Sequence, residues 1–385
     1  MASKSQRVLA LDILRGITIA GMLLVNNPGS WGHLYAPLAH AEWIGLTPTD
    51  LVFPFFMFVM GVSMYFSLKK YQFTLSGKLL WKIVRRTVIL FLIGWAVGIF
   101  ARFVYGLSGD KTVSEILENL DTLRALGVFQ RLALVYFFGS MIAVLCKHKF
   151  IPWIIALILV AYAFILGLGH GYEFSLDNII ARIDLSVLGE KHLYTETVDG
   201  VTLPIDPEGL LSTLPCIAHV LIGFMVGKII MQTHNHADRI SKLLLTGFIL
   251  MLSGWLLSYG IPVGKKMWSS TFVLITCGLA MSILALLIHV VDVKGKKRWS
   301  RFFEAFGVNP LMLYLCGTVL AIVFGAVPLW YDAEGAKVTV HSLVYDGLLD
   351  IFQPKTASCL YAILFVCLNW VLGYVLYKKK IYVKI

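Results

Sequence analysis

Residues 26–61 read NNPGSWGHLYAPLAHAEWIGLTPTDLVFPFFMFVMG. The polar part of this stretch, residues 26–50, is a loop that follows an apolar segment, residues 8–25, and leads into another, residues 51–68. Polar and ionisable side chains beside hydrocarbon are costly, so they usually have a function. His40 and Asp50 both lie in the loop, ten residues apart. An imidazole near a carboxyl group is suited to proton transfer, so we interpret the loop as a candidate active site.

The composition is that of an integral membrane protein. Of the 385 residues, 58% are hydrophobic and 14% are charged, whereas a soluble domain has about 25% charged residues. Several apolar runs approach the ~20 residues that cross a bilayer as a helix. We therefore predict an all-α, polytopic membrane protein with one domain, residues 1–385. Its ten predicted transmembrane helices lie at residues 8–26, 50–68, 83–103, 123–145, 150–168, 210–231, 241–259, 267–291, 303–327 and 357–377.

The distribution of Lys and Arg orients these helices. With a cytoplasmic N-terminus, the cytoplasmic segments hold 22 basic residues and the opposite segments hold 9. Cytoplasmic loops of membrane proteins are enriched in Lys and Arg. We therefore predict a multi-pass protein of the cell inner membrane with both termini cytoplasmic and the His40 loop outside. This topology explains the net charge of +11, and we expect no nucleic-acid partner.

The connection between the fifth and sixth predicted helices, residues 169–209, is a long outer segment rich in acids. Long loops of this kind are often functional. We predict an extracytoplasmic insertion that folds as small helices or a hairpin.

The six cysteines lie in or at the ends of apolar runs. The sequence has no Cys-x-x-Cys and no Cys/His cluster. We therefore expect neither a disulfide framework nor a metal site.

Two arginines lie well inside predicted helices, away from their ends. Arg15 follows Asp12 by three residues, so the two share a helix face and can form an ion pair. Alternatively, Arg15 belongs to a cationic lip for a phosphate-bearing ligand from the cytoplasm. Arg131 lies about two turns below the outer surface, where an arginine must find a partner or water. One interpretation is a carboxylate partner on a neighbouring helix, and Asp50 is the candidate.

Five stretches, in order, carry a resemblance to a known family: residues 11–16 (LDILRG), 25–61, 127–132 (GVFQRL), 206–215 (DPEGLLSTLP), and 265–270 (KKMWSS) with 306–311 (FGVNPL). Together they resemble the heparan-alpha-glucosaminide N-acetyltransferase family, whose bacterial members are often called NagX-like. That family acetylates the amine of a terminal glucosamine on the far side of a membrane, with cytoplasmic acetyl-CoA as the donor. The resemblance implies a transmembrane acyltransferase bundle with acetyl-CoA and an amino sugar as substrates.

The resemblance also implies roles for individual residues. His40 matches the family's active-site histidine, Asn26 an asparagine close to it, and Asp50 an acid in the same pocket. His40 would either accept the acetyl group or deprotonate the attacking ammonium, and the sequence does not choose between the two. Asp50 would orient the imidazole, and Asn26 would donate to the thioester oxyanion. We place the donor at Arg15, Arg85, Arg86 and Arg131, and the acceptor at Trp31, Trp43, Glu42, Glu208 and Lys265.

The competing interpretation is a transporter for an amino sugar or for a sugar with a proton. Several membrane helices with buried charges suit a transporter equally well. Against it, the sequence shows no internal repeat, and the histidine lies in a loop at the membrane edge rather than near the midplane, where transporter sites lie. As partners we expect the two substrates and the lipid bilayer, with a homodimer left open.

Overall fold

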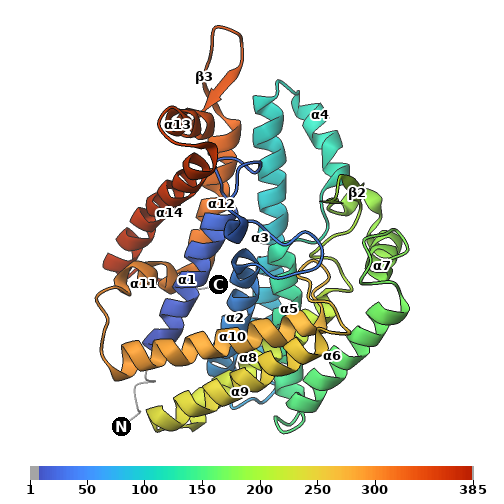
Figure 1. Cartoon of the computed structure of the whole chain (residues 1–385), viewed down its shortest axis with the longest axis vertical. Helices are drawn as coiled ribbons and strands as arrows, with labels where there is room; N and C mark the ends of the chain where they lie inside the picture. The colour runs from blue at the N-terminus through green and yellow to red at the C-terminus, as the bar shows by residue number, and fades with distance from the viewer. Residues whose placement is uncertain (1–7, 384–385) are drawn as a thin grey trace.

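The computed structural model describes residues 8–383 and is dominated by α-helices (Figure 1). This confirms the all-α, polytopic class. The predicted cytoplasmic residues Lys4, Arg7 and Lys384 lie outside the described residues. The helices are α1 (Leu9–Val25), α2 (Val52–Lys69), α3 (Gly77–Ser108), α4 (Val113–Glu118), α5 (Val128–Leu145), α6 (Ile151–Leu168), α7 (Ile179–Leu188), α8 (Thr213–Gln232), α9 (His236–Leu257), α10 (Ser270–Leu287), α11 (Arg301–Val308), α12 (Pro310–Ala326), α13 (Val340–Leu349) and α14 (Pro354–Lys378).

Eight helices of the described chain are long and apolar enough to cross a membrane, and the bent pair α11–α12 makes a ninth if it counts as one span. The axes of α11 and α12 differ by 89°, so the straight helix predicted at residues 303–327 is wrong. Pro310 explains the bend, because the residue before a proline is disfavoured in helical backbone. Asn309 accordingly has φ −126° and ψ 56°. The first predicted span is present as α1, whose 17 residues are close to the shortest length that crosses a bilayer.

Glycines bring two helix pairs into backbone contact. A Cβ added at Gly16 would lie 1.8 Å from a backbone oxygen of α11, and one at Gly307 would lie 1.9 Å from a backbone oxygen of α1. Likewise, a Cβ added at Gly61 of α2 would lie 2.1 Å from a backbone oxygen of α8, and one added at Gly223 of α8 would lie 2.2 Å from a backbone oxygen of α2. Small residues let helix backbones approach closely in membranes. These two pairs therefore place α1 against α11 and α2 against α8.

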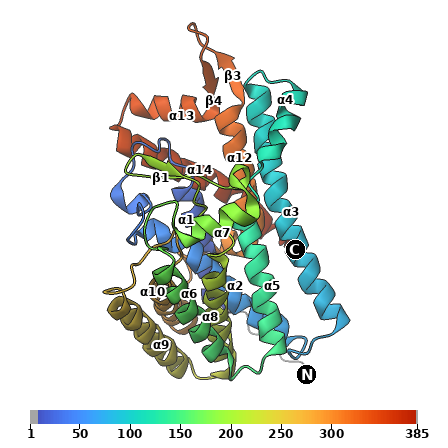
Figure 2. The same ribbon diagram turned by 90° about the vertical axis from the view of Figure 1, so that its right-hand side faces the viewer.

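The helices divide into a buried group and a peripheral group. The membrane-spanning windows of α2, α8 and α10 are 67%, 72% and 67% buried, whereas those of α3 and α9 are 6% and 17% buried. Figure 2 shows α3 along one edge of the molecule and α9 beside α10 at another. The 32 residues of α3 span about 48 Å at ~1.5 Å per residue. The helix is therefore longer than a hydrocarbon core of about 30 Å.

The 169–209 segment, for which an extracytoplasmic insertion was predicted, contains α7 and a hairpin of β1 (Glu196–Val198) and β2 (Val201–Leu203). The strands are antiparallel, with Glu196 opposite Leu203. The segment meets the loop between α1 and α2, because the Trp43 Nε1 donates to the Tyr172 carbonyl at 2.7 Å. A second hairpin, β3 (Pro328–Tyr331) with β4 (Lys337–Thr339), and α13 lie between α12 and α14. No prediction covers these last elements.

Candidate active site

The loop between α1 and α2 holds Asp50 in one orientation. Thr47 and Asp50 form a capping box at the 3-10 turn that leads into α2. Asp50 Oδ2 accepts hydrogen bonds from the amides of Ala41 and Thr47, both at 3.1 Å, and from the Thr47 hydroxyl at 3.0 Å. The residue is fully buried, so its second oxygen, Oδ1, is fixed in direction.

Asp50 Oδ1 faces the imidazole of His40, whose Nδ1 lies 2.6 Å away. A carboxylate at one ring nitrogen fixes the tautomer in which that nitrogen carries the proton and the other has the lone pair. His40 Nε2 is then the nitrogen that can take a proton or attack a carbonyl carbon. The side chain is 33% exposed, so a substrate can reach it. The structure thus brings His40 and Asp50 together.

Lys265 joins this pair from a loop 225 residues further along the chain. Its Nζ lies 3.1 Å from Nδ1 and 3.3 Å from Nε2 of His40, and 3.7 Å from Asp50 Oδ1. Burial lowers the pKa of Lys265, and the carboxylates of Asp50 and Glu208 oppose this effect. We call His40, Asp50 and Lys265 the His40 cluster. Lys265 is among the predicted acceptor residues, but its contact with His40 was not predicted.

The turn between α9 and α10 positions Lys265. The Gly264 amide donates to Ser269 Oγ, and the Ser269 amide donates to the Gly264 carbonyl, both at 3.1 Å. Trp268 adopts a left-handed backbone with φ +50° within this turn, a conformation that costs energy for a bulky residue. The Gly45 amide donates to the Val263 carbonyl at 2.7 Å. This bond ties the Lys265 turn directly to the His40 loop.

Arg124 links two further outer loops, and no prediction covers it. Its Nε donates to Asp206 Oδ2 at 2.8 Å, and its Nη2 donates to both Asp206 Oδ1 and, at 2.6 Å, Glu208 Oε2. Burial opposes the charged form, but these acids raise the pKa of Arg124. Burial would likewise raise the pKa of Glu208, but Arg124 and Arg131 hold it below its ordinary value. The predicted acceptor residue Glu208 is therefore an ionised partner of Arg124.

Arg131 does not pair with Asp50, so that candidate pairing is wrong. Arg131 is fully buried and donates from Nη2 to the Gly209 carbonyl at 3.0 Å and to Ser212 Oγ. Its guanidinium also lies 5.5 Å from the ring centroid of Trp268. The outer loops supply these partners, whereas the Asp50 oxygens are already engaged. Arg131 is thus near the His40 end of the bundle, and its predicted place among the donor phosphate ligands is not supported.

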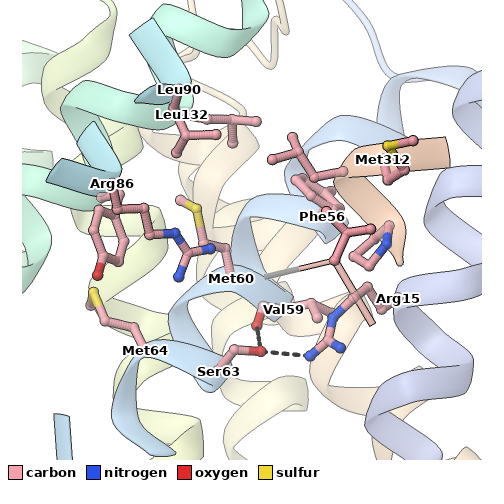
Figure 3. A pocket seen from close by; sticks show the side chains of 14 residues that line it. Arg15, Phe56, Val59, Met60, Ser63, Met64, Arg86, Leu90, Leu132 and Met312 are labelled. Atoms are coloured by element: carbon pink, nitrogen blue, oxygen red, sulfur yellow. Dashed lines mark hydrogen bonds between the residues drawn. The ribbon is translucent and has the colours of Figure 1, made fainter. Parts of the chain in front are cut away.

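A cavity of about 280 Å³, named the inner cavity after the predicted topology, contains two of the predicted donor residues, Arg15 and Arg86 (Figure 3). Arg15 donates to Ser63 Oγ at 2.7 Å and to Asp12 at 3.1 Å, so the predicted Asp12–Arg15 ion pair is confirmed. Arg86 lies over the ring of Tyr136, 4.6 Å from its centroid. Both guanidinium groups point toward the same space in Figure 3. Arg85 is exposed and is not among the described residues that line the cavity.

The remaining predicted site residues lie in different parts of the structure. Asn26 and Trp31 line a second cavity, of about 480 Å³, where Asn26 lies against Tyr314. We name it the outer cavity after the predicted topology. Trp43 is only 7% exposed and packs edge-on against Phe174. Its ring is thereby a packing group, which leaves little free surface for the predicted contact with the acceptor. Glu42 is exposed. Tyr314 was not predicted as a site residue, because its only sign of function in the sequence is a hydroxyl group within an apolar run.

Comparisons with known proteins point in one direction. No protein-family model matches the chain. A heparan-alpha-glucosaminide N-acetyltransferase of Mus musculus is 30% identical over 444 residues, covering 100% of this chain and 61% of the relative. The Homo sapiens protein of the same name is 28% identical over 446 residues, covering 98% of this chain and 60% of the relative. The chain thus spans about three-fifths of the length of these relatives. The protein is therefore related, at the level of a protein family, to the heparan-alpha-glucosaminide N-acetyltransferases.

Proposed function

We propose that the protein is a transmembrane N-acetyltransferase. It would transfer an acetyl group from cytoplasmic acetyl-CoA to the amine of a glucosamine-type sugar on the other side of the membrane. The observation that carries the proposal is the His40 cluster, in which an imidazole contacts both a buried carboxylate and an ammonium group at one end of a bundle of apolar helices. The names of the relatives support this reaction class.

The geometry of the His40 cluster suits acyl transfer to an amine. The amine nitrogen attacks the thioester carbon, a C–N bond forms, and the C–S bond breaks as the sulfur leaves with the second proton of the nitrogen, which gives the amide and the free thiol. His40 Nε2 removes the proton of the ammonium, because only the neutral amine has a lone pair. Asp50 holds the ring and stabilises the imidazolium, and the Lys265 ammonium offers positive charge to the oxyanion. The same lone pair also suits a covalent route in which Nε2 attacks the thioester first.

The inner cavity is our proposed site for the donor's phosphate groups. Arginine binds phosphate through paired, charge-assisted hydrogen bonds, and Arg15 and Arg86 line one cavity at the inner end of α1 and α3. The Arg86 Nε is buried without a hydrogen-bond partner among the described residues. Arg15 already has protein partners. Arg86 is therefore the clearer residue to test.

Replacing Arg86 with alanine should raise the KM for acetyl-CoA about tenfold or more, because a hydrogen bond to a charged group contributes about 1.5–3 kcal/mol. The KM for the sugar should stay the same. Arg85→Ala is the matched control, since Arg85 is the adjacent residue and is exposed. Initial rates over a range of both substrates would provide the measurement. Equal donor KM values in the two variants would exclude Arg86 from the donor site.

Replacing Lys265 with methionine should lower kcat about tenfold or more, because the ammonium group 3.1 Å from the imidazole offers positive charge to the oxyanion of the transition state. Methionine approximates the length of the side chain but carries no charge. The measurement is kcat at saturating concentrations of both substrates.

Lys266→Met is the control for the Lys265 variant. Lys266 is the next residue and pairs with Glu196 at 2.8 Å rather than with His40. Its replacement changes the net charge equally and should leave kcat unchanged. Equal kcat values in wild type and in Lys265→Met would contradict an electrostatic role for Lys265.

Purified protein in vesicles would test the function as a whole. Acetyl-CoA labelled in its acetyl group is supplied on one side and glucosamine on the other. We expect labelled N-acetylglucosamine to appear on the glucosamine side, and only when the donor faces the inner cavity. Glucosamine uptake without acetyl-CoA, together with no labelled product, would instead identify a transporter.

A further inference from the structure

The outer cavity lies between elements that converge at the His40 end of the bundle. Asn26 and Asn27 enter it from the end of α1, Tyr105 from the last turn of α3, and Tyr361 from near the start of α14. Its volume of about 480 Å³ falls within the ~300–1,000 Å³ of small-molecule sites. The extra length of α3 brings Tyr105 to this position.

The lining combines aromatic rings with hydrogen-bonding groups. Trp31, Tyr105 and Tyr361 supply rings, Asn26 and Asn27 supply amides, and His341 supplies an imidazole. Trp31 is 63% exposed and Tyr105 is 53% exposed, so both rings have free surface. None of the described lining residues is Lys, Arg, Asp or Glu. The cavity is thereby suited to an uncharged ligand with both apolar and polar surface.

A sugar ring has these properties, because its C–H groups form an apolar face and its hydroxyls form a polar rim. Aromatic side chains pack against apolar faces, and amides can both donate to and accept from hydroxyls. A phosphate or carboxylate ligand would instead require a cationic partner. We infer that the outer cavity binds the uncharged ring of a carbohydrate, namely the ring of the acceptor sugar rather than its amine. This inference rests on the proposed function, because it names where that acceptor binds.

Helix α12 connects this cavity with the proposed donor site. Pro310, Leu311 and Met312 line the inner cavity at the start of α12. Tyr314 and Thr318 line the outer cavity further along the same helix. The two cavities therefore follow one another along α12, with Tyr314 and its neighbour Asn26 where the outer one begins. Donor and acceptor would approach each other along this helix from opposite ends.

The absence of acidic side chains among the described lining residues has a consequence for ligand choice. A site that recognised the ammonium would reject the acetylated product, whose nitrogen is uncharged. A site that recognises only the ring and hydroxyls binds substrate and product about equally. We therefore expect N-acetylglucosamine and methyl glucosaminide to bind wild type with Kd values within about threefold of each other.

The test measures binding of labelled N-acetylglucosamine and the KM for glucosamine. Trp31→Ala and Tyr105→Ala should each weaken sugar binding and raise the acceptor KM about tenfold, with the donor KM unchanged. Trp330→Ala is the control, because Trp330 is 49% exposed on β3 and does not line the cavity. If Trp31→Ala fails to fold, Tyr105→Ala on the exposed helix α3 carries the test.

Unchanged sugar binding in the folded variants would overturn the inference. Binding of methyl glucosaminide without N-acetylglucosamine would also overturn it, since the amine would then be the recognised group. The inference and the proposed function fail separately. Acetyl transfer with an unchanged acceptor KM in both variants would reject only the cavity. Sugar binding that the two variants weaken, without any acetyl transfer, would reject only the transferase.

Discussion

His40→Ala should lose acetyl transfer by about 10³-fold or more, because the variant has no group at this position to take the proton of the ammonium or to carry the acetyl group. Acetyl-CoA should still bind, since the inner cavity is built from other residues. The measurement is label transferred from acetyl-CoA to glucosamine, together with thermal stabilisation of the protein by CoA. A ligand that binds only the folded state raises its stability, so the second readout reports an intact donor site.

His33→Ala is the matched control for this prediction. His33 lies in the same loop but contacts Ser30, with 3.3 Å between Ser30 Oγ and His33 Nδ1. It should transfer at the wild-type rate. Equal transfer by His40→Ala and wild type would remove His40 from the mechanism. Protein that retains label without the sugar, in wild type but not in His40→Ala, would select the covalent route.

Asp50→Asn should lower kcat on the order of 10²–10⁴-fold, because a neutral amide no longer stabilises the imidazolium and can hold the ring in the wrong tautomer. The substitution keeps the size of the side chain. Three donors converge on Oδ2, so the amide oxygen should occupy that place and turn its NH₂ toward His40. The ring nitrogen facing it would then have to accept, and the proton would move to Nε2.

Glu42→Gln is the control for Asp50→Asn, since Glu42 is an exposed acid of the same loop. It should leave kcat unchanged. Turnover and Tm are measured together on all three proteins. A lower Tm with normal turnover in Asp50→Asn would make Asp50 a structural group of the loop and not a positioning residue for His40.

Local patterns predicted much of the fold and part of the site. Apolar runs gave the helices, because hydrocarbon length and hydrogen bonding leave a membrane segment few alternatives. The proximity of His40 and Asp50 could be predicted because the two residues share one short loop. The 89° bend at Asn309 was harder to predict, since the hydropathy of a segment does not indicate the direction of its helix axis. Pro310 was its only signal.

Contacts between distant segments were not predictable from one sequence. The approach of Lys265 to His40 depends on how the turn between α9 and α10 docks on the first loop, and neither segment encodes the other. Arg131 was expected to need a carboxylate, but a carbonyl, a hydroxyl and an aromatic ring serve instead. The packing of Trp43 was not predictable because an aromatic residue in a polar loop can pack or bind, and only the fold decides.

The separation of His40 from Lys265 along the chain also determines how late in synthesis the site can be completed. Residues 40 and 50 leave the ribosome with the first two membrane helices, but Lys265 follows 225 residues later. At about 5–20 residues per second, the interval is about 11–45 s. During that time the nascent chain contains the His40–Asp50 pair without its ammonium neighbour. The complete cluster therefore forms only after the helices up to α9 have been synthesised, so a chain that is cut short earlier has a histidine but no finished site.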